Sequence, residues 1–175
     1  MNAHILDETH PLEEVLVWGE PGIEALLGQL LPQSRSLFRS YYEVPKARGE
    51  FACMSALIEN EGIKIIRAKD ATAKLLKSRD IPELPASIHD LKLALHQRAD
   101  SYLELYRHAK QNDLAKDGLV GITPEDVYNE VNRDMDIILE QDISQYGEQG
   151  ALRLNYLLSL SKPWPMSNIF YGRDQ

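Results

Sequence analysis

The sequence predicts an α/β fold of the α+β kind, in which a strand–helix–strand unit is followed by a long helical stretch. Two short runs with strand character, at 13–19 and 63–67, flank a helical pattern. Together these segments span about fifty residues, which suits one α/β unit. Between residues 68 and 161 hardly any strand-like run occurs, and helix signals follow one another. We therefore expect an α/β piece interrupted by a mainly helical insert of about ninety residues.

The first unit is bounded by turn residues, because the run 13–19 leads into Gly19-Glu-Pro-Gly22. Residues 23–31 favour one or two helical turns before a proline. A longer helix is expected to end at Gly62, since glycine is favoured just after a helix. Residues 63–67 then predict a second, buried strand. The apolar face of the longer helix consists of Ala47, Phe51, Met54 and Ile58.

The insert begins with two helix signals. A short helix should follow Asp70 and end in the proline-containing stretch 80–85. Ser87 and Asp90 have the spacing of a capping box, with Asp in place of the preferred Glu or Gln. The helix that they begin should fade near Asp113. Its apolar face consists of Ile88, Leu91, Leu95, Ala99, Tyr102 and Tyr106.

The strongest local helix signal is Thr123-Pro-Glu-Asp126. It combines an N-cap Thr, a Pro at the first helical position and two acids that face the helix dipole. A last helix, from about 148 to 160, should stop at Pro163. Four helices with one apolar face each should pack as a small antiparallel bundle. The apolar stripe after Thr123 consists of Val127, Val131, Met135 and Ile138.

These patterns divide the chain into three parts. Residues 1–67 form the α/β piece, 68–162 the helical insert, and 163–175 a stretch with a short strand, Ile169-Phe-Tyr171. Composition indicates a cytoplasmic protein, because no signal-peptide pattern or membrane-length apolar run occurs. A net charge of −8 argues against nucleic acid or an anionic membrane as the partner.

Several kinds of site find no support in the residue patterns. Cys53, the single cysteine, lies in an amphipathic helix and is expected to be a buried small hydrophobe. The five histidines form no His-x-x-x-His pair, so no metal is predicted, and no nucleotide-binding glycine motif occurs. Tyr41 and Tyr42, with Arg39 and Arg48 nearby, could line a pocket, although a solvated helix edge is the favoured interpretation.

The candidate ligand-binding residues lie near the end of the chain. Asp174 follows a short predicted strand and a glycine. Its carboxylate could accept two hydrogen bonds from the parallel N–H donors of a guanidinium. The amide of Asn168 could bind a substrate carboxylate or hold the loop. Arg173 should point to the opposite face and be structural. On spacing alone, the alternative is a surface turn with a local Arg–Asp pair.

The stretch Pro165-Met-Ser-Asn-Ile-Phe-Tyr-Gly-Arg-Asp174 resembles a signature of arginine deiminases and related guanidino-group enzymes. The run 14–22 is similar to the first strand and turn of that family, and residues between 37 and 50 follow its pattern. Departures are Ser167, Gly172 and Gln175, where the family usually has Pro, Thr and Pro. The resemblance implies the first part of a five-bladed β/α propeller with the helical block as an insert.

The resemblance also implies an activity. Such enzymes attack the guanidino carbon with a Cys nucleophile and use a His as acid and base, both far downstream of the Arg-Asp motif. The chain would therefore be the N-terminal part of an arginine-deiminase-like hydrolase, with Asp174 catalytic and substrate-binding, Asn168 substrate-binding, and no metal or organic cofactor. The substrate would be arginine or a relative. We expect the 175-residue chain alone to be inactive.

Two alternatives stay open. The parent protein could be an amidinotransferase of the same family, which moves the amidino group to an amine. The chain could instead be a non-catalytic binding or scaffold protein, with a helical block that docks another subunit. Open sheet edges in a short α/β piece also favour self-association into a homo-oligomer.

Overall fold

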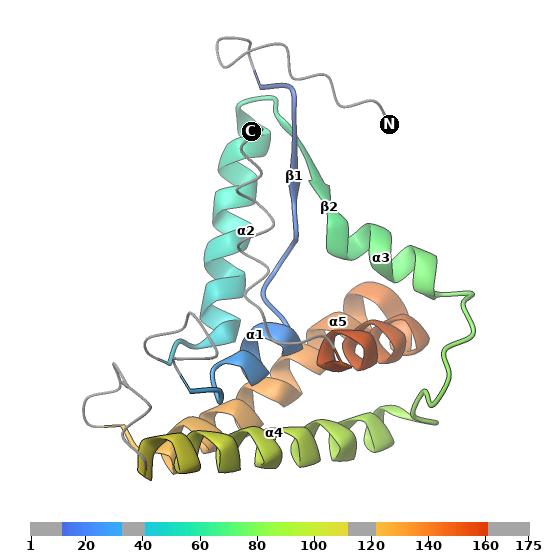
Figure 1. Cartoon of the computed structure of the whole chain (residues 1–175). Coiled ribbons are helices and arrows are strands. Elements are labelled where there is room, and N and C mark those ends of the chain that lie inside the picture. Colours follow the sequence, from blue (N-terminus) through green and yellow to red (C-terminus); the bar gives the residue numbers. More distant parts are fainter. Residues whose placement is uncertain (1–11, 33–40, 112–121, 161–175) are drawn as a thin grey trace, which may run out of the picture.

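The computed structural model describes residues 12–32, 41–111 and 122–160, and shows a mostly helical chain with a small two-stranded sheet (Figure 1). This composition supports the α+β class. The elements in chain order are β1 (Glu14–Val17), α1 (Ile23–Gly28), α2 (Val44–Asn60), β2 (Lys64–Arg67), α3 (Ala68–Leu76), α4 (Ile88–Gln111) and α5 (Pro124–Leu160).

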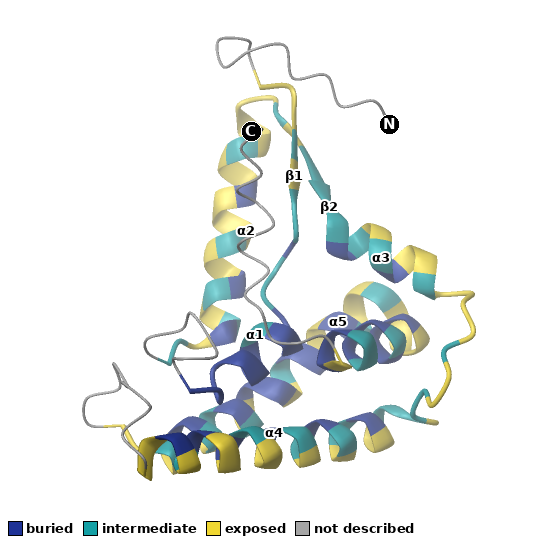
Figure 2. Ribbon diagram, in the orientation of Figure 1, coloured by how far each residue is buried: buried dark blue, intermediate teal, exposed yellow. Residues whose placement is uncertain are grey.

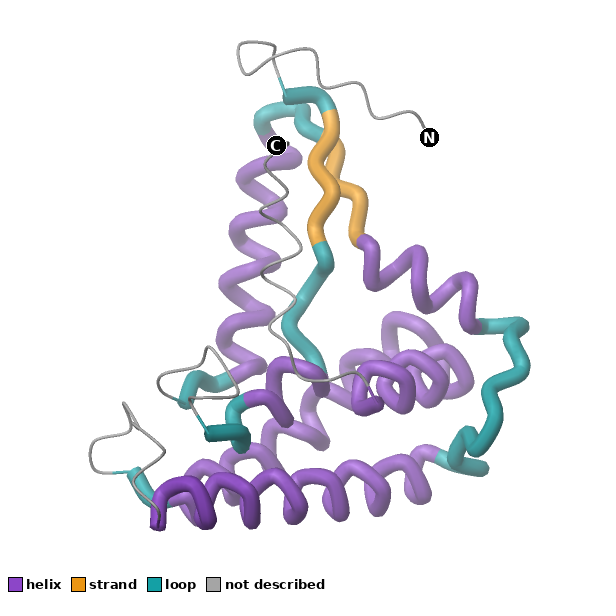
Figure 3. The backbone as a smooth tube through the Cα atoms, in the orientation of Figure 1, coloured by secondary structure: helices purple, strands orange, loops and turns teal. Residues whose placement is uncertain are grey.

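The two strands run parallel, with Glu14 opposite Lys64 and Val17 opposite Arg67 (Figure 3). The backbone N–H of Lys69 donates to the carbonyl of Trp18 at 2.8 Å and so extends the pairing beyond the ladder. Parallel strands need a crossover connection, which α1 and α2 provide here. The predicted strand–helix–strand unit is therefore confirmed.

Burial of the strand residues was predicted wrongly. In β2 the first residue is exposed and the others are only half-buried, and Leu16 of β1 is 61% exposed. In the described chain α2 is the helix that packs on β2, and two strands alone cannot bury both faces of a sheet. Figure 2 shows the upper part of this unit as largely exposed or intermediate.

Helix α2 contacts the rest of the molecule mainly through a polar face. Its buried residues are Val44, Arg48 and Ser55, whereas Met54 and Leu57 are exposed. Cys53 is exposed as well, so the expectation of a buried cysteine was wrong. The reason is the direction of α2, which projects away from the helical layer so that solvent reaches most of its circumference (Figures 1 and 2).

The main core lies between α1, α4 and α5. Helices α4 and α5 run antiparallel, because Arg107 pairs with Glu125 at one end and Lys92 with Asp136 farther along. Of the predicted four-helix antiparallel bundle, the antiparallel pair α4 and α5 is thus present. Helix α1 completes the core of this pair. The buried residues of this core include Ile23, Leu26, Leu27, Leu30, Leu91, Leu95, Ala99, Val127, Val131, Met135 and Ile138.

Both predicted helix caps form. The Ser87 hydroxyl accepts a hydrogen bond from the backbone N–H of Asp90 at 3.2 Å. The Thr123 hydroxyl accepts from the Asp126 N–H at 3.1 Å, and the Asp126 carboxylate accepts in return from the Thr123 N–H at 3.0 Å. Each pair satisfies N–H groups that lack a partner in the first helical turn.

Helix α5 consists of two parts that meet at a kink at Gly147. This residue has φ 74° and ψ 163°, a conformation that glycine adopts without steric cost. The second part agrees with the helix predicted from about 148. It packs with α3 around a smaller core of Ala73, Leu154 and Leu158.

Among the described helices, none combines the length and the apolar character that crossing a membrane requires.

Candidate functional site

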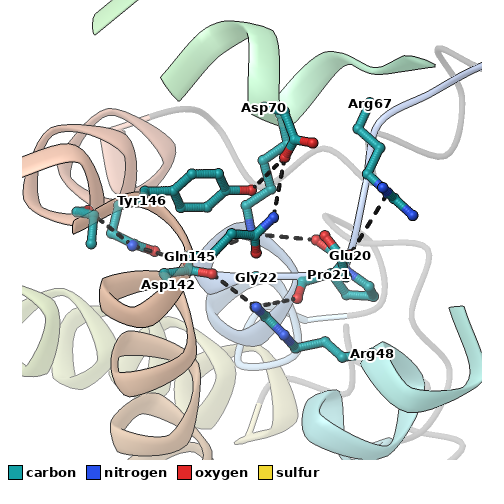
Figure 4. Close-up of polar contacts among 12 residues, drawn as sticks. Glu20, Pro21, Gly22, Arg48, Arg67, Asp70, Asp142, Gln145 and Tyr146 are labelled. Atoms are coloured by element: carbon teal, nitrogen blue, oxygen red, sulfur yellow. Dashed lines mark hydrogen bonds and ion pairs between the residues drawn. The ribbon is translucent and has the colours of Figure 1, made fainter. Parts of the chain in front are cut away.

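The predicted substrate-binding residues Asn168 and Asp174 lie outside the residues that the structure describes, as does the whole stretch 163–175. Their positions therefore stay a prediction. The polar centre that the structure does describe lies where the α/β unit meets α5. We call it the buried ion cluster, and it consists of Arg48, Lys69 and Asp142 (Figure 4).

Asp142 of α5 is fully buried and joins elements far apart in the sequence. Its Oδ1 accepts a hydrogen bond from Arg48 Nη2 of α2 at 2.8 Å. Its Oδ2 lies 3.6 Å from Lys69 Nζ and accepts from Asn155 Nδ2 at 3.1 Å. Two hydrogen bonds and the ion pair with Lys69 offset the cost of removing the charge of this carboxylate from water. The cluster therefore fastens α2 and α3 to α5.

The turn after β1 is held by the same cations. Arg48 Nη1 donates to the carbonyl of Pro21 at 3.2 Å, and Lys69 Nζ donates to the carbonyl of Glu20 at 3.4 Å. A Cβ at Gly22 would lie 2.9 Å from Lys69 Nζ and 2.9 Å from Glu24 Oε2, so the ends of these side chains would have to shift. Gly19 has φ +121° and a Cβ there would lie 3.1 Å from Lys69 Cβ. The positive φ favours glycine at position 19 of the turn.

Two further acids line this turn. Glu24, in α1, accepts hydrogen bonds through Oε1 from Trp18 Nε1 at 3.1 Å and from the Gly22 N–H at 3.2 Å. Glu20 lies 3.9 Å from Arg67 of β2. Within the described residues, Oε2 of each glutamate is buried and receives no hydrogen bond. Acidic and basic side chains both surround the turn, so this polar centre is suited to holding the turn rigidly.

Helix α5 holds the N-terminal end of α2 through hydrogen bonds. Asp134 of α5 is fully buried, and its Oδ2 accepts from the Tyr41 hydroxyl at 2.6 Å and from the Val44 N–H at 3.2 Å. Burial and this hydrogen bond raise the pKa of Tyr41 well above its ordinary value, so the hydroxyl stays a donor. Burial also raises the pKa of Tyr42. The expected solvated helix edge was therefore wrong for Tyr41, Tyr42 and Arg48, whereas Arg39 lies outside the described residues.

A surface hollow lies between α3 and α5. Its volume is about 290 Å³, and it is lined by Asp70, Ala73, Lys74, Lys77, Gln145, Tyr146 and Gly150. Asp70 Oδ1 accepts from the Tyr146 hydroxyl at 2.8 Å and from Gln145 Nε2 at 3.3 Å (Figure 4). Burial and the bond to Asp70 raise the pKa of Tyr146. The described residues contain no group of three or more His, Cys, Asp or Glu side chains that could hold a metal ion.

Sequence reasoning did not single out Lys69, Asp142 or Glu24. A signal for Asp142 was present, because it stands four residues after Ile138 and so continues the apolar stripe of Val127, Val131 and Met135. An acid on an apolar stripe is expected to be buried and paired. Lys69 has no comparable signal, since its burial depends on the arrangement of α2, α5 and the turn.

Comparison with known proteins found no match: no protein-family model, no curated protein and no solved structure is similar to the chain.

Proposed function

We propose that this chain is the N-terminal part of an arginine-deiminase-like hydrolase that acts on the guanidino group of arginine or a relative. The carboxylate of Asp174 would bind and orient the guanidinium, and Asn168 would bind the substrate carboxylate. A Cys nucleophile and a His acid/base, both supplied downstream of Gln175, would complete the site. The single cysteine of this chain is compatible with the cytoplasm.

The observation that carries the proposal is the order of parts along the chain. A parallel strand–helix–strand unit with a Gly-Glu-Pro-Gly turn comes first, a helical block follows, and the guanidinium-type motif Asn168–Asp174 comes last. This is the order that the resemblance implies for the first part of a β/α propeller with a helical insert. In the proposed protein, β1 and β2 belong to the first propeller piece.

Incomplete burial of the first unit supports the same proposal. Leu16 and Leu57 are more than half exposed, at 61% and 68%, and the sheet has two strands among the described residues. Further propeller pieces would cover such apolar groups. The apolar stripes of α4 and of the first part of α5 face the main core.

The reaction would proceed in two steps. The thiolate attacks the guanidino carbon and ammonia leaves, so an amidino thioether forms. Water then attacks the same carbon, which releases the ureido product and restores the thiol. Asp174 would contribute two charge-assisted hydrogen bonds, each worth about 1.5–3 kcal/mol, to the cationic group. Their loss corresponds to a decrease of roughly 10² to 10⁴ in kcat/KM.

The experiment uses the protein encoded by the whole reading frame. Arginine is supplied and the ureido product is quantified for the wild type, Asp174→Asn and the control Asp136→Asn, whose residue is an exposed acid on α5. We expect turnover by the wild type and the control, and the calculated loss for Asp174→Asn. Absence of turnover, or equal rates for both variants, would contradict the proposal.

Two further arms separate the remaining possibilities. The 175-residue chain alone should show no turnover, and turnover would place the nucleophile within it. Adding a primary amine acceptor tests amidino transfer, which would release ornithine and form a new guanidino compound instead of the ureido product.

A further inference from the structure

The hollow between α3 and α5 has a size suited to a small ligand. Its volume of about 290 Å³ lies near the lower limit for small-molecule sites. The lining of the hollow includes Ala73, Gly150 and Tyr146, and Tyr146 also packs against the smaller core. Gly150 contributes no side chain, and a Cβ there would lie only 3.0 Å from Tyr146 Cβ. Part of the lining is therefore apolar and lies against the smaller core.

One end of the hollow carries a carboxylate that is positioned by neutral donors. Tyr146 and Gln145 both donate to Asp70 Oδ1, which directs the side chain toward α5 (Figure 4). Among the described residues, no cation pairs with Asp70 and no hydrogen bond reaches its Oδ2. The carboxylate thus has a fixed orientation and an oxygen that is open to a cationic ligand.

The other end carries two ammonium groups. Lys74 and Lys77 are exposed, and within the described part of the chain neither forms an ion pair. They follow Asp70 by one and two turns of the same helix face, which corresponds to a rise of about 6 and 10 Å along the axis. Side chains of opposite charge, Asp70 on one side and Lys74 and Lys77 on the other, therefore line the same hollow.

We propose that this hollow binds a small dipolar molecule with a cationic and an anionic end, an amino acid with an ω-amino group or a similar zwitterion. Its cation contacts Asp70 Oδ2, its carboxylate contacts Lys74 and Lys77, and its methylene chain lies on Tyr146. A simple anion would leave the carboxylate of Asp70 unpaired, and a simple cation would leave both lysines unpaired. None of these contacting residues takes part in the proposed reaction, and the inference does not rest on the proposed enzyme activity.

The probe is 6-aminohexanoate, which lacks both a guanidino group and an α-amino group and is therefore a poor mimic of arginine. Binding to the 175-residue chain is measured by isothermal titration calorimetry. We expect a dissociation constant on the order of a millimolar, as suits a ligand with few heavy atoms. Hexanoate and hexylammonium each lack one charged end and should bind at least tenfold more weakly. Equal binding by either of them would contradict the dipolar site, as would absence of binding by 6-aminohexanoate.

Variants locate the site. Asp70→Asn should weaken binding of 6-aminohexanoate at least tenfold, and so should the double variant Lys74→Gln/Lys77→Gln, whose exposed positions leave folding intact. Lys46→Gln, at an exposed position on α2, is the matched control and should bind like the wild type. Unchanged binding in both hollow variants would overturn the proposal. The Asp174→Asn variant should retain binding, which keeps this test independent of the enzyme assay.

Discussion

Replacement of Asp142 by asparagine tests whether the buried ion cluster holds the α/β unit on the helical core. The substitution keeps the size and shape of the side chain but removes its charge. It leaves Arg48 and Lys69 buried without their carboxylate, at 7% and 0% exposure. Because a buried cation cannot be solvated in place, the folded state should lose much of its stability.

The magnitude follows from the burial of both partners. Removal of one partner from a buried ion pair costs about 3–5 kcal/mol. A protein of this kind has a total stability of about 5–15 kcal/mol, so the loss is a large fraction of the whole. Asp136→Asn is the matched control, since this acid lies on the same helix and pairs with Lys92 but is 57% exposed. The control should lose at most about 1 kcal/mol.

The assay is urea denaturation followed by circular dichroism, with the free energy of unfolding extrapolated to water. The midpoint should fall sharply for Asp142→Asn and hardly for Asp136→Asn. A third variant, Arg48→Met/Lys69→Met/Asp142→Leu, replaces all three charges by apolar side chains and should recover most of the loss. Equal losses for Asp142→Asn and Asp136→Asn would refute the reasoning, because burial of the pair would then have no energetic consequence.

Two further predictions concern the backbone and the response to acid. Gly19→Ala should destabilise the protein by about 1–3 kcal/mol, because φ is +121° at this position. Gly49→Ala in α2 should stabilise it by about 0.5–1 kcal/mol, since the added Cβ meets no neighbouring atom within 4 Å. Shifts of the melting temperature with the same sign for both variants would contradict this prediction. The pKa of Glu125 is held below its ordinary 4.5 by Arg107, and that of Asp126 below 3.8 by the helix cap. Both groups therefore stabilise the fold above these values, and the stabilisation is lost as pH falls through their folded pKa values. Melting temperatures measured between pH 6 and 3 should fall less steeply for Asp126→Asn than for the wild type, and parallel curves would contradict the assignment.

Local structure could be predicted from the sequence because its causes are local. The Thr123 and Ser87 caps depend on residues three positions apart, and both form. The stripe from Val127 to Ile138 is buried as its spacing predicts. The two strands were also predicted, because β-branched runs between turns are typical of strands.

Burial in the α/β unit could not be predicted in the same way. Cys53 and Met54 lie on a helix with an apolar pattern, but the side of α2 that packs is the one with Arg48 and Ser55. Periodicity identifies a face and does not say what covers it. Likewise, Lys69 is buried because elements far apart in the sequence meet around it, which no local pattern indicates.

The central claim is that Asp174 binds a guanidinium in an arginine-deiminase-like reaction. Release of the ureido product from arginine, measured with the protein from the whole reading frame, tests it most directly. The account predicts turnover that falls at least a hundredfold in Asp174→Asn while Asp136→Asn stays at the wild-type rate. Absence of turnover in the wild type, or equal turnover in both variants, would contradict it.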